Sequence, residues 1–240
     1  MGSNIGIVFI HGAGLNSSVW NTLLEFIPQP VLTIDFPNRN SGQHLNSGLS
    51  FEDYTDRVST DLKNWDIDQF IIVAHSIGAC VGLKVAENFK RRLKGFIAIG
   101  SVIPVSGQSF VCTLPFPQRL LMPIILSVFG TKPPHKSIEA ELGNDLPPEK
   151  ISEVVNRFTA ESRKLYTTKF TYDRLDIKHL YIRLSNDQSI PLDLQDRMAK
   201  NLRADEIETI HSGHLPMLSC PDELANLLLN FVNDIANKEA

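Results

Sequence analysis

Hydrophobic residues in this chain form short continuous runs, and between them lie segments in which apolar positions recur every three or four residues. The first run, residues 5–10, is rich in β-branched side chains and ends in a glycine turn. Runs of this kind are typical of strands that are buried on both faces. Similar runs predict further strands at residues 31–36, 70–74, 95–99, 179–184 and 206–210.

Helical spacing of apolar residues separates most of these strands. Ser50 and Asp53 match a capping box, which predicts a helix that runs through Trp65. A loop is predicted at residues 37–50, and further helices are predicted at residues 77–89, 191–202 and 221–235. Strands that alternate with single helices indicate βαβ units. The predicted fold class is therefore α/β, with a mainly parallel central sheet flanked by helices.

The alternation breaks between the strands at 95–99 and 179–184, where prolines recur and the patterning is helical. We predict an α/β core formed by residues 1–100 and 172–240, with residues 101–171 inserted as a helical cap. Apolar side chains of this insertion either line a substrate pocket or attach the cap to the sheet. They are Phe110, Leu114, Phe116, Leu120, Leu121, Met122, Ile125 and Phe129.

Composition narrows the class of protein. At 240 residues and 42% hydrophobic content, the chain has enough apolar material for one large domain. A net charge of -4 with scattered Lys and Arg lacks the basic surface that nucleic-acid binding requires, so no nucleic-acid partner is expected.

Cysteine usage and hydropathy bear on the compartment. Three cysteines without paired spacing, Cys80, Cys112 and Cys220, indicate reduced, buried thiols in a cytoplasmic protein. No export signal is recognised at the start of the sequence. The apolar run at residues 120–129 contains Pro123 and is far shorter than the roughly 20 residues that a bilayer span needs, so no membrane span is expected.

Ser76 follows the strand at 70–74 and is the candidate nucleophile. A serine on a tight strand-to-helix turn needs small residues two positions before and after it, and Ala74 and Gly78 stand there. Such a serine also needs a base and a group that orients the base. Taken alone, Ser76 fits a helix N-cap equally well.

Asp187 and His214 follow the strands at 179–184 and 206–210. Because the carboxyl ends of parallel strands converge at one edge of the sheet, both side chains are expected near Ser76. Asp193 competes with Asp187 for the role of the acid. His11 and His75, each at the end of a buried strand, are interpreted as structural residues.

The chain resembles the α/β-hydrolase superfamily, of the small capped serine esterase type. The resemblance rests on the order Ser76, Asp187, His214 and on the segments His11-Gly12-Ala13-Gly14 and Ala74-His75-Ser76-Ile77-Gly78. The resemblance implies an oxyanion hole formed by the backbone N–H groups of Ala13 and Ile77. It implies a serine hydrolase without cofactor or metal. A carboxylesterase that cleaves small or medium acyl esters with an apolar part is favoured, with acyltransferase, thioesterase or lactonase activity on the same triad as alternatives.

Two further interpretations come from different classes of protein. Gly12, Gly14 and Asp35 partly match the fingerprint of a dinucleotide-binding oxidoreductase, although Ser17 replaces the third glycine. A non-catalytic ligand-binding protein on the hydrolase fold is the other, because a fold does not fix a function. The sequence leaves the oligomeric state open.

Overall fold

The computed structural model of the chain describes residues 5–39 and 46–239. Residues 40–45 of the predicted loop at 37–50 lie outside the described residues. No helix among the described residues is both long and apolar enough to cross a bilayer.

Six parallel strands form one sheet in the order β2-β1-β3-β4-β5-β6, which confirms the predicted fold class. Their bounds are β1 Ile5–Ile10, β2 Val31–Ile34, β3 Gln69–His75, β4 Leu93–Ile99, β5 Lys178–Leu184 and β6 Glu206–Ile210. The bounds of β1 and β6 agree with the prediction. β2 is two residues shorter than predicted, because its pairing with β1 ends at Ile34.

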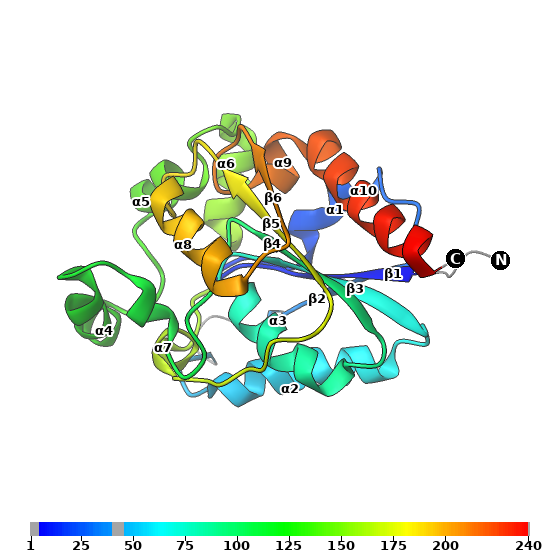
Figure 1. Cartoon of the computed structure of the whole chain (residues 1–240). Coiled ribbons are helices and arrows are strands. Elements are labelled where there is room, and N and C mark those ends of the chain that lie inside the picture. Colours follow the sequence, from blue (N-terminus) through cyan, green and yellow to red (C-terminus); the bar gives the residue numbers. More distant parts are fainter. Residues whose placement is uncertain (1–4, 40–45, 240) are drawn as a thin grey trace.

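Helices cover both faces of the sheet (Figure 1). The helices α2 Phe51–Asn64, α3 Gly78–Ala86 and α8 Leu192–Leu202 pack on one face, and α1 Asn21–Leu24, α9 Pro216–Ser219 and α10 Pro221–Glu239 pack on the other. Short 3-10 turns, η1 Ser17–Trp20 and η3 Glu87–Phe89, extend α1 and α3.

Strand β1 shows why the strand sequences are almost wholly apolar. Val8 and Ile10 belong to the core under α2 and α3, whereas Ile7 and Phe9 belong to the core under α10. Successive side chains of a strand point to opposite faces, so a strand covered on both faces needs apolar residues at every position.

The capping box at the start of α2 is present as predicted. The Ser50 hydroxyl accepts the Asp53 N–H at 3.1 Å, and the Asp53 carboxylate accepts the Ser50 N–H at 2.7 Å. This reciprocal pair satisfies two backbone donors that a helix start otherwise leaves free.

The segment between β4 and β5, residues 100–177, is called the insertion below. It contains η4 Phe110–Thr113, α4 Gln118–Phe129, α5 His135–Leu142, α6 Pro148–Arg157 and α7 Arg163–Thr167. In Figure 1, α5 and α6 lie at the same end of the sheet, and α4 projects away from the body. Ile138, Val155 and Phe158 form a small separate core between α5 and α6.

Most apolar residues in and beside α4 are exposed to solvent, which does not fit one of the two roles considered for them. Phe116 is 70% exposed and Phe129 is 79% exposed, and α4 has no buried residue. Leu120, Leu121 and Ile125 are also exposed. These side chains are too exposed to attach the insertion to the sheet, because the helix lies outside the packed layers.

The cysteines differ in part from expectation. All three are free thiols, but only Cys80 is buried, whereas Cys112 and Cys220 are partly exposed. Cys80 lies in α3, which packs directly on the sheet, and burial raises the pKa of its thiol.

Candidate active site

Ser76 lies at the turn between β3 and α3 with a backbone φ of 54°. This left-handed conformation is unfavourable for a residue other than glycine, so the surrounding structure must hold it. The Ser76 N–H donates to the carbonyl of Ile99 at 3.2 Å, and its carbonyl accepts the Val102 N–H at 3.2 Å. The end of β4 therefore fixes the turn.

Gly78 is small because backbone passes directly against it. A Cβ atom at this position would lie 2.5 Å from the carbonyl oxygen of His11 and 2.9 Å from that of Ile10. Gly12 has the same function on the other side, since a Cβ there would lie 2.9 Å from the Cβ of Ser76. The end of β1 and the start of α3 can approach each other only because both positions are glycine.

Asp187 and His214 meet beyond the ends of β5 and β6. The Nδ1 atom of His214 lies 2.8 Å from Oδ2 of Asp187, and the two side chains are 4% and 0% exposed respectively. Oδ1 of Asp187 accepts the N–H groups of Ser189 at 2.7 Å and Ile190 at 3.0 Å. Backbone donors thus hold one oxygen of Asp187, and the other oxygen faces the Nδ1 edge of the His214 ring.

Asp193, the competing candidate, stands in the first turn of α8 and is exposed. A carboxylate there suits the positive end of the helix dipole. The geometry pairs His214 with Asp187 and leaves Asp193 at the surface.

The loop that carries His214 is held from two sides. The carbonyl of His214 accepts a hydrogen bond from Nε2 of His75 at 2.8 Å, and the two rings lie 4.6 Å apart. On the other side, Asp145 accepts the N–H of Gly213, and Asn144 donates to the carbonyl of Asn186 at 2.9 Å. Asn144 and Asp145 belong to the insertion, and sequence analysis did not identify them.

His11 and His75, the histidines at the ends of β1 and β3, are fully buried, and burial favours their neutral form. Burial, followed by the charge of Arg39, lowers the pKa of His11 to about 3. Burial, followed by His214, lowers the pKa of His75 well below its ordinary value. His11 accepts the Phe36 N–H on Nε2 at 3.2 Å and donates from Nδ1 to the carbonyl of Gly12 at 2.8 Å. Both rings are thus hydrogen-bonding supports for neighbouring loops.

Residues 12–15, which include Ala13, are tied to the insertion through Glu161. One carboxylate oxygen of Glu161 accepts the Gly14 N–H at 3.0 Å, and the other accepts the Tyr54 hydroxyl at 3.1 Å. Arg39 forms an ion pair with Glu161 and donates to the carbonyl of Leu15 at 2.6 Å. The side chains of Arg39 and Glu161 are 2% and 0% exposed.

No sequence signal marks this pair, because Arg39 lies in a polar loop and Glu161 lies far away in the insertion. Only the packing of the insertion onto the β1 loop brings them together.

Within the described residues, no hydrogen bond uses the backbone N–H of Ala13 or of Ile77.

Ser76 and His214 line one cavity of about 140 Å³, together with Ala13 and Ile77. Apolar residues of the insertion form much of its wall, and Thr131, Glu141, Tyr166 and Ser189 add polar groups. Burial raises the pKa of Glu141, and His214 partly offsets that rise. Of the insertion residues considered as pocket lining in the sequence analysis, only Phe110 lies in this wall.

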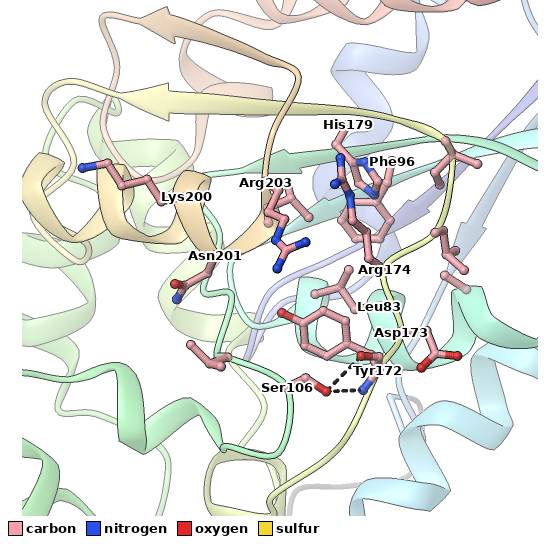
Figure 2. Close-up of a pocket in the computed structure, with 15 residues that line it drawn as sticks. Leu83, Phe96, Ser106, Tyr172, Asp173, Arg174, His179, Lys200, Asn201 and Arg203 are labelled. Atoms are coloured by element: carbon pink, nitrogen blue, oxygen red, sulfur yellow. Dashed lines mark hydrogen bonds between the residues drawn. The ribbon is translucent and has the colours of Figure 1, made fainter.

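A larger cavity of about 370 Å³ lies elsewhere and contains none of the predicted site residues (Figure 2). His179 at the start of β5 and the α8 residues Lys200 and Asn201 line it, with Tyr172 and Arg174 from the preceding loop. It therefore lies near the amino end of β5, whereas Asp187 follows the carboxyl end of that strand. Within the described residues, no cluster of three or more His, Cys, Asp or Glu side chains could hold a metal ion.

A family model described as "Alpha/beta hydrolase family" matches residues 7–227. The chain belongs to the alpha/beta hydrolase family. The match runs from β1 into α10 and so includes all the residues of the candidate site.

Two distant relatives of this alpha/beta hydrolase are matched over nearly their full length. Polyneuridine aldehyde esterase of Rauvolfia serpentina is 23% identical, and the match covers 93% of this chain and 94% of that protein. Karrikin insensitive 2 receptor IA of Petunia hybrida is also 23% identical, over 98% and 93% of the two chains.

Among solved structures, an extracellular alpha/beta-hydrolase from a Paenibacillus species aligns with a TM-score of 0.84 at 19% identity. The alignment covers 94% of this chain and 98% of that chain. Of the two curated relatives, one is named as an esterase and the other as a receptor, and the solved structure shows the same fold.

The partial dinucleotide fingerprint has a structural explanation in this alpha/beta hydrolase. Asp35 accepts the Ser17 N–H at 2.6 Å and so stabilises the start of η1. Gly14 has a φ of +76°, and a Cβ at that position would lie 2.2 Å from the ring of Phe158. The glycine loop is covered by an aromatic ring of the insertion where a pyrophosphate would have to approach.

Proposed function

We propose that this protein is a serine hydrolase, a carboxylesterase that cleaves small or medium acyl esters through an acyl-enzyme on Ser76. The observation that carries the proposal is the buried 2.8 Å contact between His214 and Asp187, beside a cavity that His214 shares with Ser76. A histidine held in this way presents Nε2 as a base, which is what a serine hydroxyl requires.

The reaction then follows from the donors and acceptors around the cavity. Nε2 of His214 takes the proton from the Ser76 hydroxyl while its oxygen attacks the acyl carbon of the ester. The N–H groups of Ala13 and Ile77 donate to the oxyanion of the tetrahedral intermediate, and one such donor contributes about 3 kcal/mol. His214 returns the proton to the departing alcohol. Water, deprotonated by His214, releases the acid and restores Ser76.

The dimensions of the cavity favour the small end of the substrate range. Its volume of about 140 Å³ is below the roughly 300–1,000 Å³ of common ligand pockets. Its apolar wall, which includes Phe110, Ile138 and Phe158, suits a short hydrocarbon acyl group. We include in the proposal that residues 101–171 act as the cap over this cavity, that the enzyme is cytoplasmic and that it needs no cofactor.

Turnover of p-nitrophenyl acetate and butyrate, combined with labelling by a fluorophosphonate probe, tests the proposal. The wild type is expected to hydrolyse these esters and to be labelled, and Ser76→Ala is expected to lose both properties. Ser152→Ala is a matched control, because Ser152 is exposed on α6 outside the cavity. Equal labelling of wild type and Ser76→Ala would exclude Ser76 as the nucleophile.

The relationship to the karrikin receptor gives a specific reason to consider ligand binding without efficient turnover as a second function. Single-turnover kinetics separate the two, because ligand binding without efficient turnover yields at most about one equivalent of product per protein molecule. Comparing esters, thioesters, lactones and acceptor alcohols in the same assay distinguishes the esterase from the acyltransferase, thioesterase and lactonase alternatives.

A further inference from the structure

Helix α4 presents an apolar surface that nothing in the described part of the chain covers. Leu120, Ile124 and Val128 are 59%, 61% and 67% exposed, and they form one row at a spacing of four residues. Leu121 and Ile125 begin a second, adjacent row and are 51% and 44% exposed. In Figure 1 the helix projects from the body of the molecule, with α7 as its nearest labelled neighbour.

Such a surface requires a partner. Isolated exposed leucines are ordinary, but contiguous apolar patches of this kind mark contacts with other molecules or with membranes. The helix has 12 residues and so measures about 18 Å, which is too short to cross the roughly 30 Å core of a bilayer. The helix can therefore lie along a membrane surface or in a protein contact, but it cannot span a bilayer.

The charged residues around α4 indicate which kind of partner its apolar surface contacts. Between Val105 and Ile138 the chain contains Arg119, Lys132 and Lys136 and no acidic residue, although its net charge is -4. Arg119 stands at the start of the helix, and Lys132 follows its end. An apolar helix with cations at both ends matches an anionic lipid surface, where each Lys or Arg near the headgroups strengthens binding.

A second copy of the chain fits this charge pattern less well. Two α4 helices packed antiparallel about a twofold axis would place Arg119 of one copy beside Lys132 of the other. Like charges at both ends of such a contact oppose it. The same cations are favourable when the helix faces anionic headgroups.

The apolar surface of α4 lies close in the chain to residues that line the cavity containing Ser76. Phe110 precedes the helix and Thr131 follows it, and both line the cavity that contains Ser76. Seating α4 in a lipid surface therefore brings the insertion side of that cavity to the surface.

We propose that α4 docks this protein on an anionic lipid surface, with the rows formed by Leu120, Leu121, Ile124, Ile125 and Val128 buried at the boundary between headgroups and acyl chains. The docking also assigns a substrate class, and this assignment rests on the proposed esterase function. The substrates are short-acyl esters dissolved in the membrane.

Cosedimentation of the full-length protein with vesicles tests the docking. The wild type is expected to bind phosphatidylcholine vesicles that contain phosphatidylglycerol, and the double variant Ile124→Glu, Val128→Glu is expected to bind at least about tenfold more weakly. Ile207→Glu is a matched control, because Ile207 is 47% exposed on β6, away from α4. A triple variant, Arg119→Gln, Lys132→Gln, Lys136→Gln, is expected to lose the preference for anionic lipid.

Sedimentation velocity and ester turnover in vesicle-free buffer complete the test. A wild-type dimer that the double variant converts to monomer, without vesicle binding, would assign α4 to a second copy and overturn the proposal. A monomer that does not bind vesicles, or one that binds neutral and anionic vesicles equally, would overturn it as well. The double variant should keep p-nitrophenyl acetate turnover in buffer. Vesicle binding by a wild type that lacks turnover would support the docking and refute the esterase.

Discussion

Glu161 of the insertion accepts the backbone N–H of Gly14 at 3.0 Å and thereby fixes the loop that carries Ala13. The same carboxylate pairs with Arg39, which donates to the carbonyl of Leu15. One buried ion pair thus holds the N–H of Gly14 and the carbonyl of Leu15. The position of the Ala13 N–H beside the cavity therefore depends on Glu161, which lies 147 positions after Gly14 in the chain.

Replacing one partner of this pair should be costly. In Glu161→Gln the side chain keeps an acceptor for Gly14 but leaves Arg39 buried without a counter-charge, a change that commonly costs about 3–5 kcal/mol. We expect urea unfolding to show a loss of that order, with a lower kcat toward p-nitrophenyl acetate.

A double variant separates stability from catalysis. Arg39→Met, Glu161→Leu removes both charges and is expected to recover much of the lost stability. Its kcat should stay low, because Gly14 and Leu15 lose their side-chain partners. Unchanged unfolding of Glu161→Gln would show that the pair contributes little to the folded state.

Replacing each of the two candidate acids by asparagine should affect catalysis very differently. Asp187→Asn removes the acceptor of the His214 Nδ1 proton and favours the wrong tautomer, so kcat should fall by about three to four orders of magnitude. Asp193→Asn changes an exposed side chain on α8 and should leave kcat within about twofold of wild type. Steady-state kinetics on purified variants measure both, and loss of activity only in Asp193→Asn would reverse the assignment.

Gly78 and Gly48 offer a matched pair for the turn at Ser76. Gly78→Ala would force its Cβ to within 2.5 Å of the carbonyl oxygen of His11, whereas nothing lies within 4 Å of a Cβ at Gly48. We expect Gly78→Ala to lose about 1–3 kcal/mol of stability and most ester turnover. Gly48→Ala should keep both, as thermal unfolding and a p-nitrophenyl butyrate assay would show. Normal turnover in Gly78→Ala would mean that the turn can move without affecting Ser76.

Acid should destabilise the fold through its buried histidines. The pKa of His11 is lowered from 6.5 to about 3 by burial and by Arg39, so between these values the unfolded chain binds a proton that the folded chain does not. Stability is therefore present above pH 6.5 and is lost as the pH falls toward 3. Between pH 7 and pH 5 the loss from His11 alone is about 2 kcal/mol.

Urea unfolding at pH 7 and pH 5 measures this loss. His11→Gln should lower stability at both pH values but flatten its dependence on pH. His135→Gln, at an exposed position that begins α5, should keep the wild-type dependence. The same dependence in wild type and His11→Gln would rule out His11 as its source.

Local sequence determined the sheet and the order of its elements. The bounds of β1 and β6, the capping box of Ser50 and Asp53 and the need for a small residue at Gly78 could all be predicted, because each depends on near neighbours in the chain or on the strand period. The same reasoning selected Ser76, Asp187 and His214 as candidates, since parallel strands bring their carboxyl ends to one edge.

Only the tertiary structure decided what those residues touch. It pairs His214 with Asp187 and leaves Asp193 in solvent, and it joins Arg39 to Glu161. It also leaves the apolar side chains of α4 exposed, although their sequence looks like that of a buried helix. The physical reason is that a side chain's own sequence sets its polarity, whereas its burial and its partners depend on segments that folding brings from far along the chain.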